Sequence, residues 1–220
     1  MEKKEYIFKF LQDLSENNSK DWMDENRVRY IQAKSYWLEE INSILERLSK
    51  HDNHFEQFKP KDTIMRINNN RMFNPDLPIY KDHFAFSPMT KSDGYARVFF
   101  SFSPRESFIG GGLWRPQKEV LKEVRSSINY EGEELFNAVN NKEFIAFFGS
   151  LGIDNQKLKN VPRGYDKEHK YGELLKYKSI SAGIIPSKEL LLNNELADII
   201  EEVYLKLKPM NDFFHKALFE

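Results

Sequence analysis

The order of hydrophobic periods along the chain constrains its fold more than any other feature. Apolar residues recur at helical spacing over residues 3–15 and again from about Lys20 to Leu48. The period then changes to alternation, which is clearest over residues 95–103. Helical spacing returns after Gly112. Helices that precede and follow a cluster of strands are typical of an α+β protein, whereas regular βαβ alternation would indicate a parallel sheet.

Short apolar segments predict the strands of a central sheet. These segments are residues 63–67, 82–87, 95–103, 106–110 and 177–185. The segment 106–110 follows 95–103 across Pro104 and Arg105, which predicts a hairpin. Because short links join successive strands, we expect a mainly antiparallel sheet packed by the N-terminal and C-terminal helices.

Local signals predict where several helices begin and end. Ser19 is a typical N-cap residue for the helix from Lys20, and Pro116 stands where a helix favours its first residue. Pro209 is expected to break the last helix. No repeat, low-complexity tract or linker marks a domain boundary, so a single domain over residues 1–220 is predicted.

Composition excludes several classes of function. The 33 Lys and Arg balance 34 Asp and Glu, and this net charge of -1 disfavours nucleic acid and anionic membranes as partners. The absence of cysteine excludes disulfides, thiolate nucleophiles and Cys-ligated metals. No signal-peptide pattern and no apolar run of membrane-spanning length occurs, so a cytoplasmic protein without a membrane partner is expected.

Residues 66–81 form the most unusual polar segment. One interpretation is a structured loop whose asparagine amides cap neighbouring elements. The other is a pocket wall whose donors bind a phosphate or carboxylate group. The candidate binding residues in this segment are Arg66, Asn68, Asn70, Arg71, Tyr80 and Lys81.

The glycine run before the next helix is a second candidate. A turn formed by Gly110, Gly111 and Gly112 can expose backbone N–H groups to an anion, and Trp114 beside it can stack on a ligand. Phosphate-loop and dinucleotide spacings are absent. The alternative is a bulge, or close packing where a side chain would clash, with Trp114 packing against the protein.

Motifs for catalysis and metal binding are missing. No serine-nucleophile motif occurs, and His51 and His54 have no further ligand cluster nearby. We therefore expect no metal site and no cofactor, and the residues leave open whether the protein is an enzyme. A second polar segment, 157–178, is either a solvated connection or a cover whose Arg163, Tyr165 and His169 close a cleft over the asparagine-rich loop.

Several stretches, in order along nearly the whole chain, resemble the domain-of-unknown-function family numbered 2461. They are residues 14–18 with Trp22 and Tyr30, Arg66-Ile67, Phe73, Asp76, Tyr80-Lys81, residues 108–116, Arg125, residues 158–166 and Leu174-Leu175. The chain departs from the family pattern at Asn69, Asn70, Met72 and Leu77, which puts in question any activity that the family's charged residues there would carry. The resemblance implies no assigned reaction.

The sequence thus favours a domain with a pocket for a small anionic ligand, phosphate- or carboxylate-bearing. The alternative is a non-catalytic protein-interaction module, in which aromatic and basic loop residues contact a partner of unknown identity. Nucleic-acid binding is a third hypothesis, disfavoured by the net charge.

Overall fold

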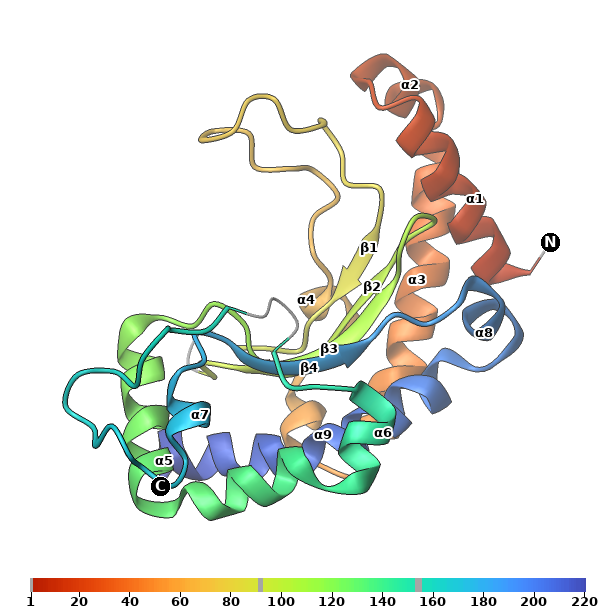
Figure 1. Ribbon diagram of the computed structural model, residues 1–220. Helices are drawn as coiled ribbons and strands as arrows, with labels where there is room; N and C mark the ends of the chain where they lie inside the picture. The colour runs from red at the N-terminus through yellow and green to blue at the C-terminus, as the bar shows by residue number, and fades with distance from the viewer. Residues whose placement is uncertain (1, 91–92, 153–155) are drawn as a thin grey trace. The chain divides into compact units, whose positions relative to one another are not determined.

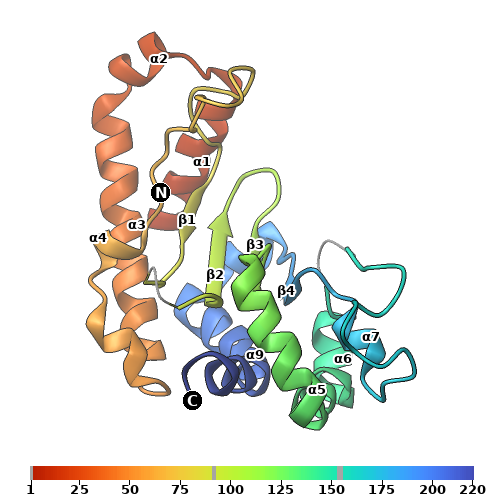
Figure 2. The same cartoon turned by 90° about the vertical axis from the view of Figure 1, so that its left-hand side faces the viewer.

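The computed structural model describes residues 2–90, 93–152 and 156–220, and the chain divides into two compact units. Unit 1 comprises the segments Met1–Pro88, Phe99–Ile109 and Ile185–Glu201, and unit 2 comprises Met89–Val98, Gly110–Ile184 and Glu202–Glu220. Two strands have residues in both units, so the division does not decide between one domain and two, and the single domain stays a prediction. Figures 1 and 2 show the helices and strands of the chain.

The helices of unit 1 pack around aromatic side chains. They are α1 (Lys3–Glu16), α2 (Lys20–Glu25), α3 (Arg27–Leu48), the 3-10 helix η1 (Asn53–Gln57), α4 (Pro60–Thr63) and α8 (Lys188–Asn193). Figure 2 shows α1 and α3 side by side. Trp37 of α3 is 1% exposed, and its ring lies 6.0 Å from that of Phe84 and 5.4 Å from that of Phe100.

Two predictions for the first half of the chain need correction. The helix predicted from Lys20 to Leu48 is two helices, because the backbone leaves helical geometry at Asn26, whose side chain bonds back to the Trp22 carbonyl. Ser19 caps α2 as expected, accepting a hydrogen bond from the Trp22 N–H. Residues 63–67 are not a strand. Thr63 ends the helical turn α4, and of the four residues after it Ile64 alone forms a bridge, an isolated one to Phe86.

The predicted antiparallel sheet is confirmed, with the strand order β1-β2-β3-β4. Its strands are β1 (Phe84–Phe86), β2 (Ala96–Phe102), β3 (Phe108–Leu113) and β4 (Ile180–Ile184). In the β1–β2 pair, Phe84 lies opposite Phe102 and Phe86 opposite Phe100. In unit 1, α1 packs on this pair through the rings of Phe8 and Phe102.

The chain before β1 rises from this strand as a two-legged arm, here defined as residues 64–83 (Figure 1). Isolated antiparallel bridges join Ile64 to Phe86 and Asn68 to Tyr80. The tip is exposed: Met72 is 77% and Phe73 89% accessible to solvent. The arm therefore carries the asparagine-rich segment away from the core of unit 1.

Unit 2 contains α5 (Lys118–Asn140), α6 (Lys142–Phe148), α7 (Gly172–Leu175) and most of α9 (Leu196–Phe219). The glycine run lies inside β3, so the predicted exposed turn before a helix is wrong. A Cβ on Gly111 would lie 2.8 Å from the Arg97 carbonyl oxygen. A Cβ on Gly112, which has φ +105, would lie 2.5 Å from the Ile180 carbonyl oxygen. Close packing therefore explains these glycines.

Helix α9 continues through Pro209, contrary to the predicted break. Proline removes one backbone hydrogen bond and bends a helix, but buried side chains on both sides of it oppose the break. Leu207, Met210 and Phe214 are all fully buried. The Asn211 amide also donates to the Arg97 carbonyl at 2.8 Å, which fixes α9 to β2.

Within the described part of the chain, no helix combines the length and the apolar character that crossing a bilayer requires.

Replacing Gly112 with alanine is expected to destabilise the protein by about 2 kcal/mol more than replacing Gly149, since the new methyl group overlaps the β4 backbone. Gly149 also has positive φ (+77), but nothing lies within 4 Å of a Cβ there. Gly149→Ala therefore reports the backbone strain alone, about 1–3 kcal/mol. Urea unfolding of both variants measures the difference, and equal losses would contradict the packing role of Gly112.

Candidate functional site

The predicted binding residues fall into two groups, six in the arm of unit 1 and four around β3 in unit 2. Arg66 is exposed, and its carbonyl oxygen accepts a hydrogen bond from the Lys81 ammonium group at 2.6 Å. Burial, and then the positive charge of Arg66, lower the pKa of Lys81 from its ordinary value. The two cations thus stand on facing legs of the arm.

Asparagine and arginine groups near the tip hold the arm's own backbone. The Asn70 side-chain oxygen accepts from the Met72 N–H at 3.2 Å, and the Arg71 guanidinium donates to the Pro75 carbonyl. Asn69 donates to the Pro78 carbonyl at 2.9 Å. These contacts agree with the interpretation of residues 66–81 as a structured loop.

Tyr80 is buried, and its backbone is fixed from outside the arm. The Asn18 amide donates to the Tyr80 carbonyl at 2.9 Å, and the Asn18 side-chain oxygen accepts from the Tyr80 N–H at 2.9 Å. This reciprocal pair attaches the arm to the turn between α1 and α2.

Around β3 the glycines are buried, whereas Trp114 is half-exposed. The Arg115 guanidinium carbon lies 5.2 Å from the centre of the Trp114 ring, a cation–π contact. Arg115 itself has positive φ (45) and donates its N–H to the Ser179 hydroxyl oxygen at 3.1 Å. Trp114 is therefore covered on one face by its neighbour.

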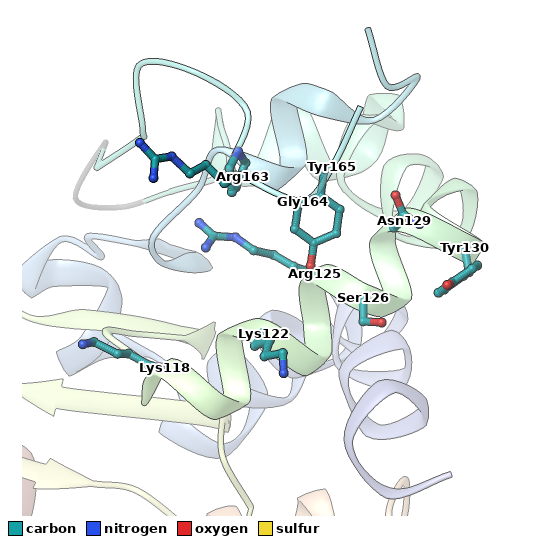
Figure 3. A pocket seen from close by; sticks show the side chains of 10 residues that line it. Lys118, Lys122, Arg125, Ser126, Asn129, Tyr130, Arg163, Gly164 and Tyr165 are labelled. Carbon is teal, nitrogen blue, oxygen red and sulfur yellow. The ribbon is translucent and has the colours of Figure 1, made fainter. Parts of the chain in front are cut away.

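A basic pocket of about 480 Å³ lies in unit 2, between α5 and the loop 162–165 (Figure 3). Its lining consists of Lys118, Lys122, Arg125, Ser126, Asn129, Tyr130, Pro162, Arg163, Gly164 and Tyr165. The α5 residues recur every three or four positions, so they occupy one face of the helix. The face extends about 18 Å from Lys118 to Tyr130. Its residues are cationic near the start of the helix and neutral or aromatic near Tyr130.

The loop of the basic pocket is held on α5 by contacts just beyond it. The His169 ring nitrogen Nε2 lies 3.3 Å from the Asn129 carbonyl oxygen. Tyr171 packs on Gly132, where a Cβ would lie 2.6 Å from the Tyr171 ring, and also contacts the ring of Phe136 at 5.7 Å. Because position 132 has no side chain, the segment around Tyr171 can approach α5 closely.

Within the described residues, the cations of the basic pocket have no acidic partner. Among the described residues, no carboxylate lies within 4 Å of the charged groups of Lys118, Lys122, Arg125 or Arg163, and none lines the pocket. Other surface cations do form such pairs, for example Arg47 with Asp198. Four clustered cations without counter-charges create a local positive potential that favours an anion.

Arg125 is the central cation of this pocket. It is half-buried and donates one hydrogen bond to the Tyr177 carbonyl at 2.9 Å, while its buried Nε has no hydrogen-bond partner among the residues that the structure describes. Burial lowers the pKa of the Arg125 guanidinium, and Tyr165 acts in the opposite direction. Figure 3 shows the Arg125 and Arg163 side chains extending the same way, one from α5 and one from the loop.

Sequence reasoning named parts of this pocket without locating it. The family resemblance includes Arg125 and residues 158–166, and the hypothesis that Arg163, Tyr165 and His169 cover the asparagine-rich loop stays a prediction. In the structure Arg163 and Tyr165 line a pocket with α5, and His169 contacts the Asn129 carbonyl of that helix. The available signal was the cationic helix face, but nothing in the sequence shows which loop packs on it.

A second cavity, of about 260 Å³, lies in unit 1 and is lined in part by the predicted residues Arg66 and Asn68. No group of three or more metal-ligating side chains occurs among the described residues.

Gly132→Ala is expected to loosen the loop that completes the basic pocket, although alanine is more favourable than glycine inside a helix by about 1 kcal/mol. The added methyl group must displace Tyr171. Amide hydrogen exchange in residues 158–172 should accelerate, while exchange in β2 stays unchanged. Asn137→Ala, at an exposed position of the same helix, is the control. Unchanged exchange in Gly132→Ala would show that this contact does not hold the loop.

Comparisons with known proteins place the chain in a family without an assigned reaction. No curated protein and no solved structure matches it significantly. The model of a family described as conserved hypothetical protein (DUF2461) matches residues 6–213, nearly the whole of the 220-residue chain. The protein therefore belongs to the DUF2461 family of conserved hypothetical proteins.

Proposed function

We propose that this protein binds a small anionic ligand, an organic phosphate in preference to a carboxylate, in the basic pocket. The observation that carries the proposal is a cavity with four lining cations, for which the described part of the chain provides no acidic partner and no lining carboxylate. A phosphate ester carries up to two negative charges and three acceptor oxygens. It therefore gains more than a monocarboxylate from two arginines that approach from different elements.

The half-buried guanidinium of Arg125 supports this choice. Removing a cation from water costs free energy, and the lowered pKa of Arg125 reflects that cost. A bound anion offsets this cost through its charge and through hydrogen bonds to the guanidinium. The first turn of α5, where Lys118 lies, adds the positive end of the helix dipole to the same end of the pocket.

The size and the other lining residues favour a ligand larger than inorganic phosphate. A volume of about 480 Å³ lies in the range of small-molecule sites. Figure 3 shows the Tyr165 ring between the two arginines and the pair formed by Asn129 and Tyr130. We infer that the phosphate lies on the arginine side and that the neutral part of the ligand lies towards Asn129. The function proposed is binding, without a reaction.

Thermal unfolding with ribose 5-phosphate and adenosine monophosphate tests the proposal. Ribose and adenosine at the same ionic strength serve as neutral controls. A ligand at a hundred times its dissociation constant adds about 2.7 kcal/mol to stability, which raises Tm by roughly 5–10 °C for a chain of this size. Stabilisation by the phosphate esters alone is the expected result, and its absence across the series contradicts the proposal.

Two double variants that remove the same number of positive charges distinguish a specific binding site from general electrostatic attraction of the ligand. Arg125→Gln with Arg163→Gln removes two pocket cations and should weaken binding at least tenfold, since each hydrogen bond to a charged group contributes about 1.5–3 kcal/mol. Lys159→Gln with Lys167→Gln removes two exposed cations near the same loop that do not line the pocket. Equal weakening in both double variants would show that the effect is only long-range electrostatics.

The second candidate function is protein interaction through the arm, favoured by the exposure of Met72 and Phe73 at its tip. Large apolar side chains grouped at a projecting tip are unusual on a surface that contacts only water. The nearby Leu77 is also exposed, at 37%. A partner would cover these three side chains.

A photo-crosslinking amino acid at position 73, incorporated in the cells that make the protein, tests this alternative. A discrete crosslinked product from position 73, absent when the probe replaces the similarly exposed Val28 of α3, is the expected result. Products from both positions, or from neither, would count against a specific docking role for the tip.

A further inference from the structure

The second cavity lies at the base of the arm in unit 1 and is independent of the basic pocket. Its lining consists of Tyr30, Lys34, Trp37, Leu38, Lys61, Ile64, Met65, Arg66, Ile67, Asn68 and Phe84. One face of α3 supplies four of these residues, the first leg of the arm supplies five, and α4 and β1 supply one each. We refer to it as the aromatic cavity.

The inner part of the aromatic cavity is apolar and rigid. Trp37 and Phe84 are 1% and 4% exposed, and their ring centres lie 6.0 Å apart. The ring of Tyr30 lies 6.5 Å from that of Phe84. Three aromatic rings held in contact present flat apolar surface, which suits another ring in stacked or edge contact.

Trp37 meets the cavity through its ring. The indole N–H makes no hydrogen bond within the described structure, but it is closed to solvent and therefore also to a molecule in the cavity. A ligand there contacts the apolar surface of the Trp37 ring and not this donor.

Cations surround the apolar part. Lys34, Lys61 and Arg66 line the cavity, and among the described residues none of them has a carboxylate within 4 Å. No acidic residue belongs to the lining. The Lys81 ammonium group bonds to the carbonyl of Arg66, which fixes the backbone there and leaves the Arg66 guanidinium available. This arrangement attracts a single negative charge to the edge of an apolar cavity.

From these observations we infer that the aromatic cavity binds a small aromatic monocarboxylate. Its ring lies against Trp37 and Phe84, and its carboxylate contacts Arg66 and Lys34. The volume of about 260 Å³ is below that of drug-sized sites, which limits the ligand to about one ring with a short acid chain. The apolar lining disfavours a phosphate dianion, whose removal from water costs more than that of a carboxylate.

Trp37 provides a direct signal for the test. The chain has three tryptophans, so Trp22→Phe with Trp114→Phe leaves Trp37 as the reporter. Titration with 3-phenylpropionate should give a saturable change in Trp37 emission. The neutral 3-phenylpropionamide should bind at least tenfold more weakly, because it has the same ring without the charge. Calorimetry on the wild-type protein repeats the measurement without any substitution.

Matched variants locate the site. Lys34→Gln with Arg66→Gln should weaken 3-phenylpropionate binding at least tenfold, whereas Lys50→Gln with Lys59→Gln, at exposed positions outside the cavity, should leave it unchanged. Binding of 3-phenylpropionate should also persist in the double variant Arg125→Gln with Arg163→Gln. That outcome separates the test of the aromatic cavity from the test of the basic pocket. No saturable signal, equal binding of the acid and the amide, or equal loss in both double variants would overturn the inference.

Discussion

The close approach of backbones at Gly111 and Gly112 determines how unit 2 is assembled. Carbonyl oxygens of β2 and β4 occupy the space that side chains on β3 would need, and Leu207 and Met210 of α9 approach from the helix side. The position of β3 in turn determines where α5 starts, a few residues further along the chain. The close packing at Gly111 and Gly112 therefore determines the position of the cationic face of α5, although these glycines are not part of that face.

Two physical patterns made much of the fold predictable from the sequence. The helical stripe of α1 and the alternation in β2 depend on neighbouring residues alone, and both appear where they were expected. The errors occur where other contacts override local preference. Pro209 stays inside α9 because buried neighbours hold the helix, and the glycines extend β3 because the sheet needs close contact there. Nothing in the local sequence carries that information.

The candidate sites were harder to predict than the fold, because each combines segments that are distant in sequence. Arg125 and Arg163 come together only when the loop packs on α5, through contacts of His169 and Tyr171 that have no sequence signature. Arg66 and Asn68 were identified from composition, but the aromatic part of their cavity comes from α3 and β1. In both cavities the described residues provide no acidic partner for the lining cations, and in the basic pocket burial also lowers the pKa of Arg125.

The attachment of the arm separates its tip from the core of unit 1. Asn18 fixes the backbone at Tyr80, whereas the tip beyond is held by contacts of Asn70 and Arg71 within its own loop. A substitution in the tip therefore changes these local contacts before it affects β1 or the core. The tip can thus vary in sequence at little cost to folding.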